Sequence, residues 1–251
     1  IRMASVEQAL ALLAEHGRAA AMGAETVPLA QAVGRRLAEA VVAQVSQPPA
    51  DVSAMDGYAA RFADMKMGAS LKVIGESRAG TPFGLRLGPG EAVRIFTGAY
   101  VPEGADHVLI QEDTKREGGA VTVAFEQKKP ENIRRAGLDF SRGQTLVPAG
   151  HAMTEGAISL AAAANAASVS VRKLPRIGVM ANGDELMPPG SALGPGQIVN
   201  SIQPALLALI RRWGAAPVNL GAARDDEADV IQRISQPCDV IVTIGGASVG
   251  D

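Results

Sequence analysis

The strongest constraint on the fold is the β-branched run at residues 240–244, which is followed at once by the glycine-rich stretch 245–250. A short apolar run without alternation, bounded by a charge and by glycines, predicts a buried strand of a parallel sheet. Open α/β sheets bind ligands at the carboxyl ends of such strands, where small residues let backbone N–H groups approach an oxyanion. The pattern Gly-Gly-x-Ser-x-Gly is equally compatible with a plain tight turn, so the loop alone leaves both interpretations open.

Residues 174–251 as a whole predict a βαβαβ unit. Strands are expected at 177–181, 218–220 and 240–244. The first helix runs from about Gln203 to Trp213, with a buried stripe of Ile202, Leu206, Leu209, Ile210 and Trp213. The second helix begins with Asp225 as its N-cap and ends at Pro237.

Acidic residues gather on the loops that follow these strands. Alternating strands and helices imply a parallel sheet with right-handed crossovers, so the three loops share one edge of the sheet. The loops carry Asp184 and Glu185, Asp225 and Asp226, and Ser248 and Asp251. Each residue has a simpler structural interpretation when taken alone, but carboxylates beside backbone amides at such an edge suit Mg²⁺ that bridges to a bound phosphate.

Residues 51–140 change in character and predict a β-rich domain. Strands are expected at 71–74, 92–96, 107–110 and 120–123. Three polar clusters stand between them. The first places Asp56 before a glycine, the second places Thr97 after a strand, and the third offers the guanidinium groups of Arg134 and Arg135 to an anion. Taken singly, these clusters are more simply a turn, a strand-end cap and a solvated loop.

The remaining segments predict scaffold. A helix begins at the capping box of Ser5 and Gln8 and ends at Gly17, a strand is expected at 38–45, and a helix capped by Thr154 continues through 158–167. We expect a multidomain chain of α/β plus β class. Residues 1–50 and 141–173 form one discontinuous, extended domain, residues 51–140 are inserted into it, and residues 174–251 form the α/β domain.

Composition excludes several classes of protein. The net charge of the 251 residues is −2 with scattered Lys and Arg, and aromatic residues make up 3%, so we expect neither a basic nucleic-acid surface nor a base-stacking platform. A single cysteine, Cys238, permits no internal disulfide, and the three histidines lack metal-ligand spacing. We see no signal peptide or membrane span, which favours a cytoplasmic location without membrane contact.

Five motifs occur in order along the chain: Ser-Ala-Met-Asp-Gly-Tyr-Ala at 53–59, Arg-Ile-Phe-Thr-Gly-Ala at 94–99, Asn-Ile-Arg-Arg-Ala-Gly at 132–137, Asn-Gly-Asp-Glu-Leu at 182–186 and Gly-Gly-Ala-Ser-Val-Gly at 245–250. In their order and intervals they resemble the molybdopterin molybdenumtransferase family, known as MoeA in bacteria and as the E-domain of gephyrin in animals. The resemblance implies an elongated homodimer, with 1–50 and 141–173 as its dimerisation domain and 174–251 as a molybdopterin-binding domain. It implies Mg²⁺-dependent insertion of molybdate into adenylyl-molybdopterin with release of AMP. It also allows contact with the molybdopterin adenylyltransferase of the same pathway.

The same resemblance assigns roles to individual residues. Glu185 and Asp225 would lie near the nucleotide phosphates and Mg²⁺, and Asp56 and Thr97 of the dimer partner would close the same cleft. Arg134 and Arg135 would steer molybdate. The remaining residues assigned to ligand binding are Asn182, Gly183, Asp184, Gly245, Gly246, Ser248, Gly250 and Asp139.

The chain departs from the family pattern at several points. Asp139 follows leucine where the family usually has glutamate, and Asn182 stands where it usually has serine or threonine. The family's final-loop acid falls beyond Asp251, and its C-terminal β domain is absent, so we expect little transferase activity from a chain that ends there. A non-catalytic dimeric scaffold or ligand-binding relative is the alternative, and Mg²⁺ dependence of nucleotide binding discriminates between them. The sister adenylyltransferase is a weaker candidate, because that activity needs no β-rich insertion.

Overall fold

The computed structural model describes residues 5–19, 22–125 and 128–245 of a mixed α/β protein. The chain forms two compact units. The first contains Ile1–Glu39, Ala149–Glu155 and Ser168–Asp251, and the second contains Ala40–Pro148 and Gly156–Ala167. The expected three-domain division of the chain stays a prediction.

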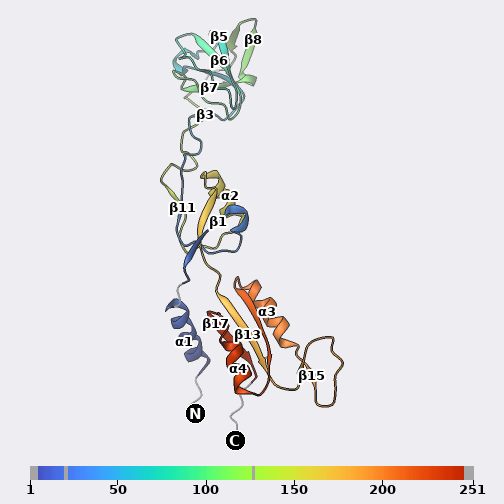
Figure 1. The fold of residues 1–251 in the computed structure, drawn as a ribbon. Coiled ribbons are helices and arrows are strands. Elements are labelled where there is room, and N and C mark those ends of the chain that lie inside the picture. The colour runs from blue at the N-terminus through green and yellow to red at the C-terminus, as the bar shows by residue number, and fades with distance from the viewer. Residues whose placement is uncertain (1–4, 20–21, 126–127, 246–251) are drawn as a thin grey trace. The chain divides into compact units, whose positions relative to one another are not determined.

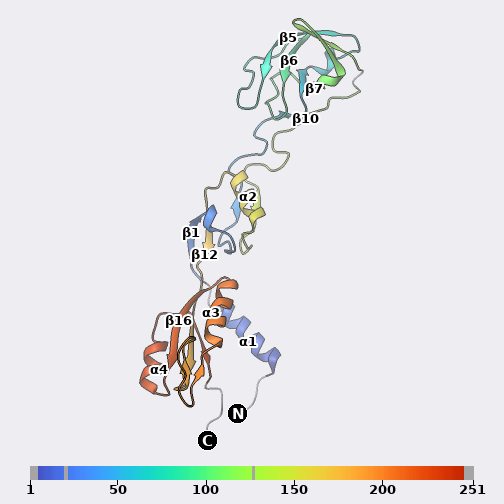
Figure 2. The ribbon, with the colours of Figure 1, turned by 90° about the vertical axis from the view of Figure 1, so that its right-hand side faces the viewer.

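The first unit contains the parallel sheet that residues 174–251 predict. Its central strand is β13 (Arg176–Asn182), which pairs in parallel with β16 (Ala216–Ala223) on one side and β17 (Val240–Ile244) on the other. Helix α3 (Ile202–Arg212) packs on one face of the sheet and α4 (Glu227–Ile234) on the other, as Figure 2 shows. Because both faces are covered, the strands consist of nearly continuous apolar runs.

The buried face of α3 differs from the predicted stripe. Ile210 is buried, but Ile202 and Trp213, which were expected to be buried, are 60% and 69% exposed. Gln203 takes an inward position instead and is only 5% exposed. The prediction was wrong at both ends of the helix because it gave every inward position to an apolar side chain, whereas a polar group can be buried when it is fully hydrogen-bonded.

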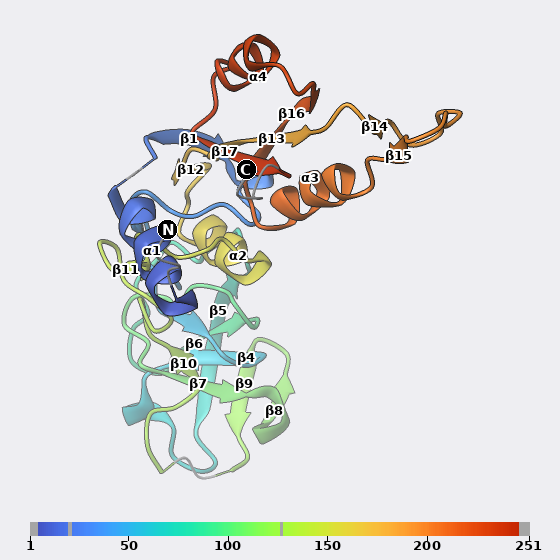
Figure 3. The same ribbon diagram turned by 90° about the horizontal axis from the view of Figure 1, so that it is seen from below.

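A short arm connects β13 to α3, which the sequence pattern did not indicate (Figure 3). Its strands β14 (Leu186–Met187) and β15 (Ile198–Val199) pair in parallel. The base of the arm is fixed by two backbone hydrogen bonds, from the Ile198 N–H to the Glu185 carbonyl and from the Asn200 N–H to the Met187 carbonyl, each 2.8 Å long. The arm therefore ties the acidic loop after β13 to the start of α3.

The second unit is built around a six-stranded sheet in the order β7-β4-β6-β5-β9-β8 (Figure 1). Strands β5 and β6 are parallel, and the other neighbours are antiparallel. The four strands expected from the sequence are confirmed, and β4 and β8 are additional. The bounds are β4 (Gly57–Ala60), β5 (Ser70–Ser77), β6 (Glu91–Ile95), β7 (His107–Ile110), β8 (Thr114–Glu117) and β9 (Ala120–Val123), with 3-10 turns η2 (Phe62–Asp64) and η3 (Gln111–Asp113).

Antiparallel two-stranded pairs join segments that are distant in the sequence. In the second unit, β2 pairs with β11 and β3 pairs with β10, and in the first unit β1 pairs with β12. The strand expected at 38–45 is shorter, because the Ala43 and Gln44 N–H groups bond to carbonyls outside β11. The bounds are β1 (Ala24–Pro28), η1 (Leu29–Gln31), β2 (Val41–Val42), β3 (Val52–Ser53), β10 (Ile133–Arg134), β11 (Thr145–Val147) and β12 (Ser168–Arg172).

The two remaining helices largely follow the sequence prediction. Helix α1 (Val6–Ala19) begins at the predicted capping box, where Ser5 and Gln8 exchange hydrogen bonds of 3.0 and 3.2 Å. It continues past Gly17, because glycine weakens a helix without necessarily ending it. Helix α2 (Glu155–Ala163) stops before the predicted end, and Asn165 follows it with a left-handed φ of 68°.

Candidate functional site

The carboxyl ends of β13 and β16 lie side by side in the parallel sheet. Asn182 pairs with Ala223 at the last register position of the two strands. The Gly183 N–H donates to the Ala223 carbonyl at 3.1 Å, and the Asp225 N–H donates to Asp184 Oδ1 at 3.4 Å. The structure therefore brings two of the three predicted loops into contact.

Three exposed acidic side chains stand on these two loops: Asp184, Glu185 and Asp225. In the described part of the chain, the carboxylates of Glu185 and Asp225 have no hydrogen-bond or ion-pair partner. Over the same residues, no three His, Cys, Asp or Glu side chains are grouped so that they could hold a metal ion. A divalent cation at this edge would thus need further oxygens from a bound phosphate, which is the usual way in which Mg²⁺ is held.

The predicted structural role of Asp225 is wrong. The N-cap of α4 is Asp226, whose Oδ2 accepts a hydrogen bond from the Asp229 N–H at 3.1 Å. Sequence pattern alone could not separate two neighbouring aspartates, since both are good N-cap residues. Asp225 is consequently free of a capping role.

Asn182 and Gly183 shape the end of β13. Asn182 Oδ1 is buried and has no hydrogen-bond partner among the residues described. A buried oxygen in this state is costly, and it can accept a hydrogen bond or coordinate a cation when a ligand is present. A Cβ at Gly183, where φ is +146°, would lie 2.3 Å from Glu185 Oε2, so the Glu185 carboxylate rests over the glycine.

The third predicted loop begins at the same edge. Ile244 pairs with Ala181 on β13, and Gly245 follows with a left-handed φ of 94° that favours glycine. The other predicted ligand-binding residues of this loop, Gly246, Ser248 and Gly250, lie outside the described residues.

On the second unit, the structure brings Asp56 and Thr97 together. The Thr97 N–H and Oγ1 both donate to Asp56 Oδ1 at 2.8 Å. These bonds, with a smaller contribution from the positive charge of Arg94, lower the pKa of Asp56 below its usual value. A Cβ at Gly57 would lie 2.0 Å from the Leu109 carbonyl oxygen, so glycine is required directly after this aspartate.

The predicted arginine pair forms ion pairs with carboxylates of the same unit. Arg134 Nη2 donates to both carboxylate oxygens of Asp139, at 2.9 and 3.0 Å. Arg135 Nη1 donates to Asp51 Oδ2 at 2.6 Å, and Asp51 Oδ1 accepts from the Ala136 N–H. Asp139 therefore lies beside Arg134, and both guanidinium groups are already partly neutralised.

Residues 4–165 match the family model of the MoeA N-terminal region, domains I and II. The chain belongs to the MoeA family. Residues 178–251, which include the sheet edge, match a second model described as a probable molybdopterin binding domain. The two models together cover both groups of candidate residues.

Curated relatives of this MoeA chain carry the name molybdopterin molybdenumtransferase. One from Nostoc sp. is 38% identical over 235 residues, covering 90% of this chain and 54% of the relative. Another, from Mycobacterium tuberculosis, is named molybdopterin molybdenumtransferase 2 and is 41% identical over 236 residues, covering 90% and 58%. The chain therefore spans little more than half the length of these relatives.

Solved MoeA structures have a similar fold. A molybdopterin biosynthesis MoeA protein from Pyrococcus horikoshii superposes with a TM-score of 0.87 at 32% identity, covering 98% of this chain and 64% of that one. A second structure of the protein from this organism gives 0.86 at 29% identity, covering 97% and 67%. In the described residues of this MoeA chain, every helix is too short or too polar to span a bilayer.

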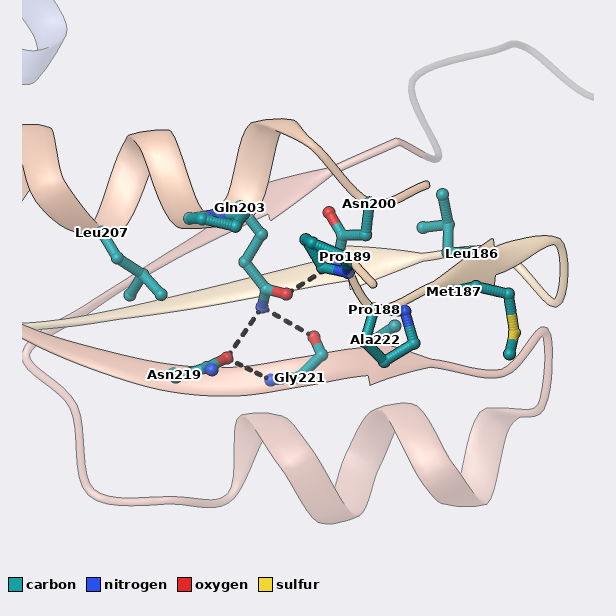
Figure 4. Close-up of a pocket in the computed structure, with 11 residues that line it drawn as sticks. Leu186, Met187, Pro188, Pro189, Asn200, Gln203, Leu207, Asn219, Gly221 and Ala222 are labelled. Atoms are coloured by element: carbon teal, nitrogen blue, oxygen red, sulfur yellow. Dashed lines mark hydrogen bonds between the residues drawn. The ribbon is translucent and has the colours of Figure 1, made fainter. Parts of the chain in front are cut away.

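Sequence reasoning missed a cavity of about 270 Å³ in this MoeA chain, beside the start of α3 (Figure 4). Its walls are mostly apolar, and Gln203, Asn200 and Asn219 supply the polar groups. Figure 4 shows the Gln203 amide pointing toward β16, where it meets Asn219 and Gly221. The available signal was a glutamine at an inward helical position, which indicates a buried polar network.

Proposed function

We propose that the intact protein inserts molybdate into adenylyl-molybdopterin and releases AMP, in a reaction that requires Mg²⁺. The observation that carries this proposal is the sheet edge, where the buried Asn182 Oδ1 and the exposed carboxylates of Glu185 and Asp225 have no hydrogen-bond or ion-pair partner among the described residues. This edge falls within residues 178–251, the range of the probable molybdopterin binding domain. The name of the curated relatives supports the reaction class.

The donor set at the edge suits Mg²⁺. Glu185 and Asp225 would hold the ion, with Asn182 Oδ1 as a neutral oxygen donor, and the phosphates of the substrate would complete the shell. When bound, Mg²⁺ would neutralise charge on the phosphoanhydride that is cleaved. Asp184 accepts a hydrogen bond from the Asp225 backbone and so would keep the two acidic loops together as the ligand binds.

Backbone groups would bind the rest of the substrate. Gly245 begins a loop whose small residues, among them Gly246, Ser248 and Gly250, would present N–H groups to the pterin phosphate. Such donors stabilise negative charge that develops during transfer, provided that they are held in place beforehand.

The second unit would complete the cleft of a partner subunit in a homodimer. Asp56, whose Oδ1 is held by Thr97, would face the bound nucleotide with Oδ2. Arg134 and Arg135 would guide molybdate, because each guanidinium keeps N–H donors beyond those used by Asp139 and Asp51.

Release of AMP from adenylyl-molybdopterin tests the proposal directly. In the intact protein, we expect release that needs both molybdate and Mg²⁺ and that stops when the cation is chelated. Glu185→Gln and Asp225→Asn should each lower kcat/KM by about 100-fold or more, since each removes a charge that the transition state needs. Glu227→Gln, an exposed acid at the start of α4, is the matched control and should stay near wild type.

Two results would contradict the proposal. Release of AMP at an unchanged rate in both acid variants would remove the sheet edge from the reaction. Nucleotide binding that is independent of Mg²⁺, without turnover, would favour a non-catalytic scaffold of the same fold.

A further inference from the structure

Strand β16 carries a bulge just before the loop of Asp225. Val179 pairs with Asn219 and Met180 pairs with Gly221, so Leu220 is an extra residue on β16. Because side chains alternate between the two faces of a strand, one extra residue moves all later side chains to the opposite face. Bulges near active sites often change the direction of a functional side chain in this way. The bulge therefore sets the orientation of the segment that leads to Asp225.

Gln203 holds the bulge from the α3 face (Figure 4). Its Nε2 donates to the carbonyls of Val179 and Gly221 at 2.9 Å and to Asn219 Oδ1 at 3.0 Å. Its Oε1 accepts from Asn200 Nδ2 at 2.7 Å. Both polar atoms of this buried amide are thus used within the protein, and three of its bonds reach the strands on either side of the irregular register.

Asn219 contributes only its oxygen to this network. Oδ1 accepts from Gln203 Nε2 and also from the Gly221 N–H at 2.9 Å. Asn219 as a whole is exposed, so we expect a substitution here to leave no cavity in the core. An oxygen acceptor at this position is what the bulge requires, and an aspartate would supply one.

Arg233 holds the bulge from the opposite, α4 face. Its Nη1 donates to the Leu220 carbonyl at 2.7 Å, and its Nε donates to Asp229 Oδ1 at 3.1 Å. Asp229 Oδ2 in turn accepts from the Arg224 N–H at 2.9 Å. A Cβ at Gly221, where φ is +77°, would lie 2.7 Å from Arg233 Nη1. The chain of contacts therefore runs from the bulge to the residue directly before Asp225.

We propose that Gln203 and Arg233 are positioning residues, which hold the bulge of β16 from both faces of the sheet and so place Asp225 beside Asp184 and Glu185. The inference rests on the proposed function, because it gives this placement a purpose in Mg²⁺ and phosphate binding. Neither side chain needs to touch the substrate. Loosening the bulge should displace Asp225, and displacement by about 1 Å at a reacting centre can cost a factor of about 100 in rate.

A pair of variants at Asn219 tests the inference with little risk to folding. In the intact protein, Asn219→Leu removes the shared acceptor, and we expect kcat/KM for AMP release to fall by about tenfold or more. The Mg²⁺ concentration that gives half the maximal rate should rise as well, which a purely structural role would not require. Asn219→Asp keeps the oxygen and should stay within about threefold of wild type.

Arg233→Met provides the matching test on the other face. It should lower kcat/KM and raise the Mg²⁺ requirement as Asn219→Leu does, whereas Arg212→Met, at an exposed position of α3, should do neither. Hydrogen exchange of the amides at residues 220–225 supplies a readout that is independent of activity. It should become faster in Asn219→Leu and Arg233→Met and stay unchanged in Asn219→Asp.

The possible results separate the two claims. Unchanged amide exchange in Asn219→Leu and Arg233→Met overturns the positioning role, whatever the activity of the wild type. Faster exchange with wild-type kcat/KM and Mg²⁺ dependence also overturns it. Absence of AMP release from the wild-type protein overturns the proposed function, and the positioning role falls with it.

Discussion

Asp56 is held by Thr97, a residue 41 positions further along the chain. Both donors of Thr97 meet the same carboxylate oxygen, and the second oxygen has no hydrogen-bond partner in the part of the chain that the structure describes. The backbone N–H, the hydroxyl and the charge of Arg94 all stabilise the ionised form, and the pKa of Asp56 is lowered as a result. The residue is therefore presented as a charged group in a fixed position.

Thr97→Val tests this arrangement, because it removes the hydroxyl and keeps the backbone N–H. We expect the pKa of Asp56 to rise part of the way toward its ordinary value, as measured by carboxyl-carbon NMR titration. A carboxyl group whose pKa is lowered by folding stabilises the folded state at pH values above its ordinary pKa of about 3.9. This stabilisation is lost as the pH falls through the lower pKa of the folded state. The variant should therefore lose less of its stability than wild type below about pH 4.

The control for this titration is Thr81→Val, at an exposed position of the same unit. It should leave the pKa of Asp56 unchanged. An unaltered pKa in Thr97→Val would show that the hydroxyl does not stabilise the carboxylate.

At the scale of elements, two neighbouring aspartates at the start of α4 have different roles: Asp226 stabilises the helix, and Asp225 is a candidate for the proposed chemistry. Asp226 caps the helix through the Asp229 N–H, whereas the carboxylate of Asp225 has no partner in the described residues. Asp229 in turn binds the Arg224 N–H and the Arg233 side chain, and these bonds lower its pKa. The N-terminus of α4 is therefore stabilised by Asp226 and Asp229 and does not depend on Asp225.

Substitution of these two aspartates by alanine should affect different properties, stability for Asp226 and activity for Asp225. Asp226→Ala should lower the free energy of unfolding by about 1 kcal/mol, the usual value of an N-cap side chain. Asp225→Ala should change it by no more than about 0.5 kcal/mol, as expected of a surface substitution, while reducing AMP release. Urea unfolding and turnover measured on the same preparations check both expectations, and a larger loss of stability in Asp225→Ala would contradict the capping assignment.

Much of the element order could be predicted, because local pattern determines it. The apolar runs of β13 and β17 and the capping box of α1 are local signals, and the structure confirms them. Strands such as β3 and β10 are only two residues long, lack such a signal and exist because a distant partner strand supplies their hydrogen bonds. The buried face of α3 was predicted wrongly for the same reason. Gln203 is buried because it bonds to Asn219 and Gly221 at the bulge of β16, and no local pattern reveals that bulge.

The candidate site also combines contacts that the sequence pattern predicts with contacts that it does not. Glycine and acid spacing indicated the loops after β13 and β16, and parallel topology placed them at one edge. The contact of Asp56 with Thr97 could be expected only from family motifs, because no spacing rule joins residues so far apart. The positioning contacts of Gln203 and Arg233 depend on side-chain geometry, which no motif contains.

At the scale of the whole molecule, the candidate residues are divided between two compact units. Asp56 and Thr97 belong to one unit, and Asp184, Glu185 and Asp225 belong to the other. Under the proposed function, a complete cleft takes the first group from one subunit of a homodimer and the second group from its partner.

Mixing two inactive variants tests this division. Asp56→Asn and Asp225→Asn proteins should each lack activity alone. After unfolding and refolding together in equal amounts, about half of the dimers would be mixed, and one of the two clefts in each mixed dimer would be intact. We expect about a quarter of wild-type AMP release. No recovery in mixed dimers, verified by differently tagged subunits, would place both residues in the cleft of a single subunit.

The pairing of β3 with β10 has a consequence for how this protein can be altered. Ser53 and Ile133 are directly opposite each other, and the Ala54 N–H donates to the Asn132 carbonyl at 2.9 Å. The roughly eighty residues between them therefore begin and end at neighbouring positions in space. We therefore expect that the segment carrying the six-stranded sheet can be replaced by a short linker without changing how the flanking segments connect.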